Sequence, residues 1–199
     1  MANNKGVVAR RIAVMGFPSV GKSSISQRFV SGTFPSHYDA TIEDNYDVSY
    51  SAFGRSYRLR VTDTAGQQPH SLFPRSCQSN VDGFVLVYAI NERDSFEVLD
   101  SIRDKILEAY GTVGSEAFPM VLVGNKTDLP NYERKVPTEE GRRLAASWGL
   151  VDKGFLEISA RDAATSDVFE SILFQIEVAE GFLSPRQRAK DNAKSCALS

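Results

Sequence analysis

The sequence is poor in the residues that build disulfide frameworks and metal clusters. Its 199 residues include two cysteines, Cys77 and Cys196, and two histidines, His37 and His70. Two cysteines alone do not indicate a structural disulfide, and we expect Cys77 to be a free thiol. Both histidines lie in expected loops and are interpreted as solvated or packing groups, so no histidine-based catalytic site is predicted.

Long apolar runs and an excess of one charge are also lacking. No apolar run reaches transmembrane length and Met1–Val8 is short and polar, so we expect a protein made and kept in the cytosol. The 23 basic and 25 acidic residues give a net charge of −2, which does not imply a general grip on nucleic acid. The length and an apolar fraction of 42% suit one globular domain with a real core.

A complete phosphate-binding motif stands near the start of the chain. Residues 16–23 match G-x-x-x-x-G-K-[ST] and lie between a strand-like run and residues at helical spacing. This strand–loop–helix setting favours a phosphate-binding loop over an ordinary glycine-rich turn. The glycines let backbone N–H groups surround an anion, and the helix N-terminus adds its dipole. Lys22 can reach the β- and γ-phosphates, and the Ser23 hydroxyl can ligate Mg²⁺. The nucleotide-binding residues predicted here are Ser19, Val20, Gly21, Lys22, Ser23 and Ser24.

Strand-like segments recur along the chain, at residues 10–16, 45–52, 56–62, 83–90, 119–124 and 154–158. The continuous apolar runs at 85–90 and 119–123 are typical of central strands in a parallel sheet. Gly54-Arg55 lies between two alternating segments and indicates a hairpin.

Helical patterns fill the intervals between these segments. Asp94 followed by Glu97 resembles a capping box, and Thr138 before an acidic pair is typical of an N-cap. A stripe at residues 168–179 predicts a last helix. The alternation predicts an α/β fold that binds its ligands at the carboxyl ends of the strands.

A second group of candidate residues follows the third strand-like segment. Asp63 at the strand end is placed to hold Mg²⁺ through water, and Gly66 can offer its N–H to a γ-phosphate. Gln67 could orient an attacking water. Alone this pattern would mark a turn, and its position after a strand and a phosphate-binding loop makes it evidence for phosphate chemistry.

A third group, Asn125-Lys126-Thr127-Asp128, ends the fifth strand-like segment. The Asp128 carboxylate can accept two hydrogen bonds from guanine, whereas adenine offers the opposite pattern at its ring edge. Lys126 can lay its aliphatic stem against the base, and Ser159-Ala160 can offer a backbone N–H to the guanine oxygen. An ATP site would fit the first motif alone but conflicts with Asn125 and Asp128.

These four motifs are residues 16–23, Asp63–Gln67, Asn125–Asp128 and Ser159-Ala160. In this order and each at a strand end, they resemble the Ras superfamily of small GTPases over residues 10–182. The resemblance implies a P-loop NTPase G domain, with a six-stranded, mostly parallel sheet and helices on both faces. It implies an enzyme that hydrolyses GTP to GDP with Mg²⁺. Outside this domain we expect a flexible leader at 1–9 and a flexible tail at 183–199. The catalytic residues implied are Lys22, Thr41, Gly66 and Gln67.

Residues 34–43 resemble the switch I segment of that superfamily. The resemblance implies that Thr41 ligates Mg²⁺ and bonds the γ-phosphate. Phe34, followed by Pro35, would stack on the base, and Tyr38 would close over the phosphates. The effector surface implied comprises Tyr38, Asp39, Ala40, Thr41, Ile42, Glu43, Asp44 and Asn45.

Within the superfamily the chain is most similar to the Rheb branch. The similarity lies in residues 19–24, in Ser71-x-Phe73-Pro74 and in Ala146-Ser147-Trp148. It implies a monomeric, GTP-dependent activator of the TOR kinase complex that is farnesylated and resides on internal membranes.

Several positions depart from the superfamily pattern. Pro18 stands where Ras proteins have glycine and Rheb proteins have arginine, and it stiffens the loop and removes an N–H. Pro69 is expected to hold Gln67 away from the water site. Arg161 replaces a usual lysine, with a small expected effect because the backbone is the expected contact there.

No arginine is placed to assist hydrolysis from within the chain, because Arg55, Arg58 and Arg75 are interpreted as surface charges. We therefore expect slow intrinsic hydrolysis and a GTPase-activating partner. Two alternatives stay open. One is a Ras-like GTPase of another signalling pathway, and the other is a largely GTP-locked interaction protein, which Pro18 and Pro69 favour.

The sequence closes with Cys196-Ala197-Leu198-Ser199, a C-a-a-X box. The terminal serine indicates farnesyltransferase as a partner and Cys196 as the lipidation site. A single lipid gives weak, reversible attachment, and the nearby basic residues are spread out. We therefore expect the protein at the cytoplasmic face of internal membranes, with a cytosolic fraction.

Overall fold

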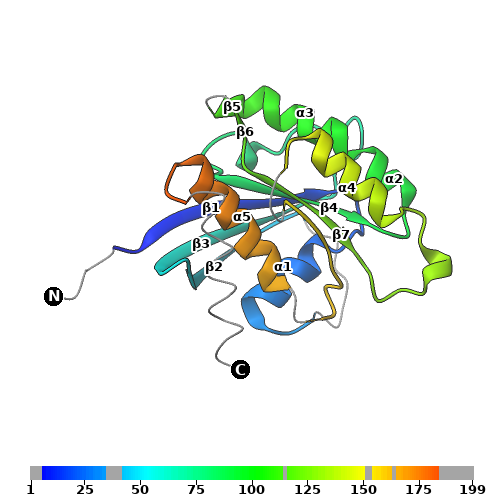
Figure 1. The fold of residues 1–199 in the computed structure, drawn as a ribbon, viewed down its shortest axis with the longest axis horizontal. Coiled ribbons are helices and arrows are strands. Elements are labelled where there is room, and N and C mark those ends of the chain that lie inside the picture. The colour runs from blue at the N-terminus through cyan, green and yellow to red at the C-terminus, as the bar shows by residue number, and fades with distance from the viewer. Residues whose placement is uncertain (1–5, 35–41, 114–115, 151–153, 163–164, 184–199) are drawn as a thin grey trace.

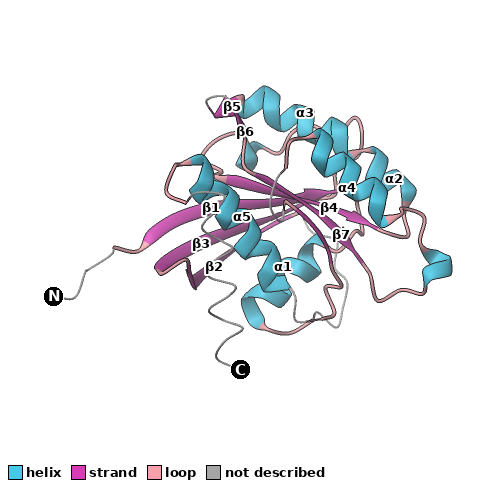
Figure 2. Ribbon diagram, in the orientation of Figure 1, coloured by secondary structure: helices cyan, strands magenta, loops and turns pink. Residues whose placement is uncertain are grey.

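A central sheet organises the chain, as Figures 1 and 2 show. The computed structural model describes residues 6–34, 42–113, 116–150, 154–162 and 165–183. Over these residues, six strands form one sheet in the order β2-β3-β1-β4-β7-β8. Only β2 and β3 are antiparallel neighbours within this described sheet. The strands are β1 (Val8–Gly16), β2 (Glu43–Ala52), β3 (Arg55–Thr64), β4 (Gly83–Ala89), β7 (Met120–Asn125) and β8 (Phe155–Glu157). The predicted six-stranded, mostly parallel sheet is thus confirmed.

Helices cover both faces of this sheet, also as predicted (Figure 1). On one face lie α1 (Lys22–Ser31) and α5 (Thr165–Ala179), and on the other lie α2 (Arg93–Glu97), α3 (Leu99–Tyr110) and α4 (Thr138–Ser147). The short 3-10 turns are η1 (Arg75–Cys77) and η2 (Asn131–Glu133). A small hairpin of β5 (Thr112–Val113) and β6 (Glu116–Ala117) was not predicted. No described helix is long and apolar enough to cross a membrane.

Successive residues of β4 alternate between the two cores. Val85 and Val87 belong to the core under α1 and α5, whereas Phe84 and Leu86 belong to the core under α3 and α4. All seven residues of β4 are buried, because helices cover both faces of the sheet at this strand. This burial explains why the strand reads as one continuous apolar run.

The structure shifts two boundaries that the sequence predicted. The hairpin turn lies one residue earlier than predicted, and the sheet begins inside the predicted leader. The β2–β3 turn consists of Phe53 and Gly54, with φ of 51° and 68°, and a type I′ turn requires positive φ at both positions. The strand β1 begins at Val8, two residues before its predicted start. Val8 and Ala9 pair with β3, so these two residues of the predicted leader belong to the sheet.

Both predicted helix caps are wrong. The α2 helix begins at Arg93 and no side chain of this described segment caps it, so Asp94 lies inside the first turn. Pro137 occupies the N-cap position of α4, and the Thr138 hydroxyl instead donates to Glu157 at 2.8 Å. A distant carboxylate therefore takes the bond that local sequence assigns to the helix N-terminus.

A buried carboxylate fastens the end of α5 to the sheet. Glu177 is fully buried, and it accepts hydrogen bonds from Arg10 of β1 at 2.8 Å and from Arg55 of β3 at 2.9 Å. Arg10 also pairs with Glu180, and the Arg55 guanidinium lies over the ring of Phe182. The interpretation of Arg55 as a surface charge is therefore wrong, because its partner lies 122 positions further along the chain.

We predict that Glu177→Ala destabilises the fold by roughly 3 kcal/mol or more, because removing one partner of a buried ion pair leaves the remaining charges uncompensated. Urea unfolding at a fixed GDP concentration would measure the loss, since bound ligand itself shifts stability. Glu139→Ala is the control, because Glu139 pairs with Arg142 on the surface and both side chains are more than half exposed. Equal midpoints for the two variants would contradict the prediction.

Candidate nucleotide site

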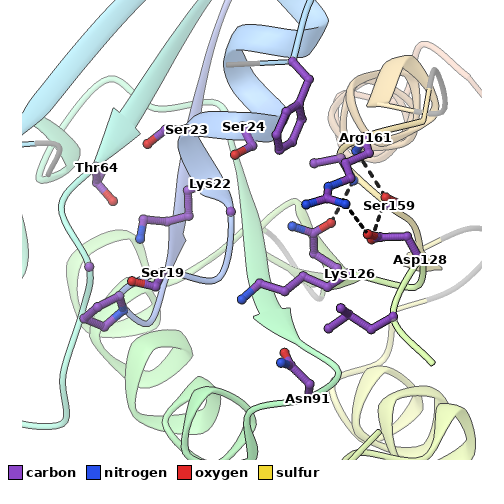
Figure 3. Close-up of a pocket in the computed structure, with 17 residues that line it drawn as sticks. Ser19, Lys22, Ser23, Ser24, Thr64, Asn91, Lys126, Asp128, Ser159 and Arg161 are labelled. Carbon is purple, nitrogen blue, oxygen red and sulfur yellow. Dashed lines mark hydrogen bonds and ion pairs between the residues drawn. The ribbon is translucent and has the colours of Figure 1, made fainter. Parts of the chain in front are cut away.

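A cavity of about 600 Å³ opens at the carboxyl ends of the parallel strands. Figure 3 shows that its walls come from separate loops that follow β1, β3, β4, β7 and β8. Its volume is in the range of small-molecule sites, and its place agrees with the rule for open α/β sheets. The predicted residues that line it are Ser19, Gly21, Lys22, Ser23, Ser24, Phe34, Gly66, Asn125, Lys126, Asp128, Ser159 and Ala160.

The phosphate end of the cavity is built mainly from backbone. Ser19 and Gly21 both have positive φ, of 60° and 97°, which turns the loop after β1 around the cavity. Gly21 is the N-cap of α1 and has no side chain to cap it. The N–H groups of the first turn are therefore available to an anion, and the helix dipole favours negative charge there.

Lys22 brings a buried cation to the same end. The side chain is 6% exposed, and Nζ donates to the Phe17 carbonyl at 3.0 Å. Burial lowers the Lys22 pKa to about 8, while the nearby Asp63 carboxylate opposes this shift. Asp63 is fully buried at the end of β3. Lys22 lines the cavity, whereas Asp63 does not line it and lies buried close enough to act on the Lys22 ammonium, a setting suited to a phosphate and a divalent cation.

Asn125 joins the two ends of the cavity. Its Nδ2 donates to the Val20 carbonyl at 2.8 Å, and its Oδ1 accepts from the Ala160 N–H at 3.0 Å. A Cβ at position 21 would lie 2.2 Å from Nδ2, so only glycine allows this approach. Val20 is 1% exposed and lies behind the loop rather than among the lining residues, so its side chain holds the loop in place.

Asp128 lies at the opposite end, where the sequence predicts the base. Its Oδ1 accepts from the Ser159 hydroxyl at 2.8 Å, which orients the carboxylate. Lys126 lines the cavity beside it with a positive φ of 73°, and burial lowers its pKa. The carboxylate and the aliphatic stem of Lys126 can therefore meet the edge and the face of one purine ring.

The Arg161 side chain contacts more of the site than the sequence predicted. Its guanidinium is 5.7 Å from the centroid of the Phe34 ring, and Nη1 is 3.6 Å from Asp128 Oδ2. It therefore contacts two predicted base-binding side chains as well as lining the cavity. Thr64, Asn91 and Leu129 also line the cavity and were missed. Thr64 ends β3 and Leu129 directly follows Asp128, so their place beside motif residues was a usable signal.

Gln67 lies outside the cavity lining. It is 4% exposed, its N–H donates to the Gly16 carbonyl at 2.8 Å, and its Nε2 donates to the Ala65 carbonyl at 3.0 Å. Gly66 packs against Pro18 so closely that an added Cβ would lie 2.6 Å from three Pro18 atoms. In this arrangement the side chain of Gln67 faces the protein rather than the phosphate end.

Part of the predicted site lies outside the described residues, namely Pro35, Tyr38, Asp39, Ala40, Thr41 and Cys196. The described part of the effector segment begins at Ile42, which is 90% exposed. Its carbonyl accepts from the Ala65 N–H at 3.2 Å, so the two loops predicted to sense the γ-phosphate meet here. Glu43, Asp44 and Asn45 follow as exposed residues of β2.

We predict that Asp128→Asn lowers the affinity for GDP by roughly 10- to 100-fold, because a hydrogen bond to a charged group contributes about 1.5–3 kcal/mol. The amide donates where the xanthine C2 oxygen accepts, so the variant should prefer xanthosine diphosphate. Displacement of a fluorescent nucleotide would measure both affinities. Asp162→Asn is the control, since Asp162 is exposed and does not line the cavity. Unchanged GDP affinity in Asp128→Asn would show that this carboxylate does not read the base.

Comparison with known proteins agrees with this geometry. Residues 11–178 match the Ras family. The chain is 45% identical to the GTP-binding protein Rheb homolog 1 of Caenorhabditis elegans, over all of this chain and 98% of that protein. It is 41% identical to the GTP-binding protein Rheb of Mus musculus, over 88% and 92%. It is 39% identical to the GTP-binding protein rhb1 of Schizosaccharomyces pombe, over 86% and 89%. This chain therefore belongs to the Ras family and is, within it, a Rheb-like small GTPase.

Proposed function

We propose that this GTPase is a switch that activates the TOR kinase complex while GTP is bound and releases it after hydrolysis to GDP. The observation that carries the nucleotide part is the single cavity that joins a backbone anion cradle to the Asp128 carboxylate. The TOR part rests on the similarity to Rheb proteins over most of both chains.

Mg²⁺ is the metal that we assign to this site. The buried Asp63 and the Ser23 hydroxyl offer the oxygen atoms that Mg²⁺ prefers, next to the phosphate end. Asp63 would hold the ion through water, and Thr41 would join when GTP is bound. When present, the ion neutralises charge on the β- and γ-phosphates.

Different residues of the chain would bind the phosphates and detect the γ-phosphate. Lys22 and the first-turn N–H groups of α1 would bind the phosphates, and the Gly66 N–H would meet the γ-phosphate. The hydrogen bond from Ala65 to the Ile42 carbonyl gives that contact a path to the effector segment. Losing the γ-phosphate would therefore loosen both loops together.

Slow intrinsic hydrolysis is part of the proposal. The buried position of Gln67 and its bond to the Ala65 carbonyl support it, because a glutamine held there cannot orient the attacking water. A GTPase-activating protein would then supply the missing groups. The same observation favours the second candidate function, a largely GTP-locked interaction protein.

Kinase assays with the purified TOR complex would test the effector. We expect the full-length protein loaded with a non-hydrolysable GTP analogue to raise kinase activity, and the GDP form to leave it at the basal level. Ile42→Asp should abolish activation, because it places a charge on the effector segment. Tyr132→Asp is the matched control, since Tyr132 on η2 is 87% exposed and Ile42 is 90% exposed.

Two results would contradict the proposal that the TOR complex is the effector. No activation by either nucleotide form would exclude TOR as the effector. Capture of the GTP form by the Ras-binding domains of other kinases would place the protein in another signalling pathway.

We also propose that farnesyltransferase modifies Cys196, which gives a weakly attached protein at the cytoplasmic face of internal membranes and a cytosolic fraction. The C-a-a-X box and its terminal serine support this assignment. A single lipid gives marginal binding, and each basic residue near an anionic surface adds about 1 kcal/mol.

Fractionation of cells should therefore find Cys196→Ser almost entirely in the supernatant, with an intact mass that lacks a farnesyl group. Ser195→Ala is the control, because it leaves the four-residue box unchanged and should behave as the unaltered protein does. Equal pelleting of the Cys196 variant and the control would refute lipid attachment at this cysteine.

A further inference from the structure

A lysine on α3 holds the loop that follows the predicted catalytic glutamine. Lys105 Nζ donates to the Pro69 carbonyl at 3.1 Å and to the Ser71 carbonyl at 2.8 Å. We propose that Lys105 is a positioning residue that keeps residues 67–74, the switch II loop, against α3 and thereby keeps Gln67 out of the nucleotide cavity. This proposal rests on the proposed slow hydrolysis and names the residue that sets it.

The switch II loop has no regular helix in the structure, and its two prolines disfavour one without deciding where the loop lies. Pro69 has no N–H to donate, and Pro74 disfavours helical backbone at Phe73. No helix or strand is assigned between Ala65 and Pro74, a segment that the structure describes throughout. Irregular backbone of this kind leaves carbonyl groups that a helix would have paired, so they need partners from elsewhere.

The Lys105 ammonium is the charged donor that pairs two of these carbonyl groups. It has three N–H groups, and hydrogen bonds from a charged donor are stronger than neutral ones. The two carbonyls it binds are two residues apart, so one side chain fixes both sides of His70. Ser71 adds a local turn, because its N–H donates to the Gln68 carbonyl and its hydroxyl accepts from the Gln68 N–H. The ammonium and the local turn together give this loop one position on α3.

The position of Gln67 depends on that position of the loop. Upstream, the Gln67 N–H is bonded to the Gly16 carbonyl, and one residue, Gln68, separates Gln67 from Pro69, the first residue whose carbonyl Lys105 binds. Downstream, Phe73 packs on the core beneath α3, with its ring centroid 6.3 Å from that of Phe84. For the Gln67 side chain to reach the cavity, the backbone at 67–71 must move, and this movement breaks the Lys105 bonds. Losing one hydrogen bond to a charged group shifts such an equilibrium by about tenfold.

Hydrogen exchange of the GDP-bound full-length protein tests the first half of the proposal. We expect Lys105→Met to speed exchange at residues 67–73 by about tenfold, with α3 amides unchanged. Lys105→Arg should keep the protection, because a guanidinium also donates to carbonyls. Lys135→Met is the control for loss of a surface lysine, since Lys135 is exposed and lies before α4. Unchanged exchange at 67–73 in Lys105→Met would overturn the proposal.

Single-turnover GTP hydrolysis tests the second half. Lys105→Met should hydrolyse bound GTP faster by up to about tenfold, and the gain should vanish in the double variant Lys105→Met with Gln67→Ala. Gln67→Ala alone gives the rate with which the double variant is compared. Faster exchange without faster hydrolysis, or a gain that survives Gln67→Ala, would overturn the link between Lys105 and Gln67.

These results are separate from the test of the effector. A loss of TOR activation leaves the exchange of residues 67–73 as expected, whereas failure of the Lys105 proposal leaves TOR activation and GDP affinity intact.

Discussion

The nucleotide cavity depends on one buried side-chain amide. Asn125 stands at the end of β7 and bonds to the backbone of the phosphate-binding loop through its donor and to the backbone of Ala160 through its acceptor. An amide carries both groups in one plane, so a single side chain satisfies buried backbone atoms on two loops. The phosphate end and the base end of the cavity are thereby held at one separation. The bare α-carbon of Gly21 is the other half of this constraint, because any side chain there would fill the space of the amide.

The contacts that order the loop between β3 and η1 differ from those that build the cavity. Prolines disfavour a helix, Pro18 packs against Gly66, and Lys105 binds two carbonyls of the irregular backbone. Each of these contacts orders the loop without bringing a catalytic side chain to the phosphates. The described part of the site therefore offers several groups that can bind a nucleotide, whereas the predicted catalytic glutamine lies outside the cavity lining.

The opposite end of the sheet is stabilised separately. Glu177 joins α5 to two arginines near the amino ends of β1 and β3, whereas the cavity lies at the carboxyl ends of these strands. Its carboxylate is fully buried, and with Glu180 the network holds two carboxylates and two guanidinium groups, so the charges balance. This network sets the direction in which α5 ends, while Asn125 sets the separation of the loops at the other edge.

Local patterns in the sequence determined the fold class and most of the site. Strand and helix periods, together with motifs at strand ends, are short-range signals, and parallel strands bring their carboxyl ends to one edge whatever the details. Hence the sheet and the covering helices agree with the predictions, and most of the described residues predicted to bind the nucleotide line one cavity. Tertiary structure alone decided the partners of side chains: Thr138 with Glu157, Arg55 with Glu177, Arg161 with Phe34, and Lys105 with the loop after Gln67. These groups could each have bonded to water or to a neighbour in sequence. Packing brings one particular partner within reach of each side chain, burial also excludes water around Glu157 and Glu177, and no local pattern in the sequence records that choice.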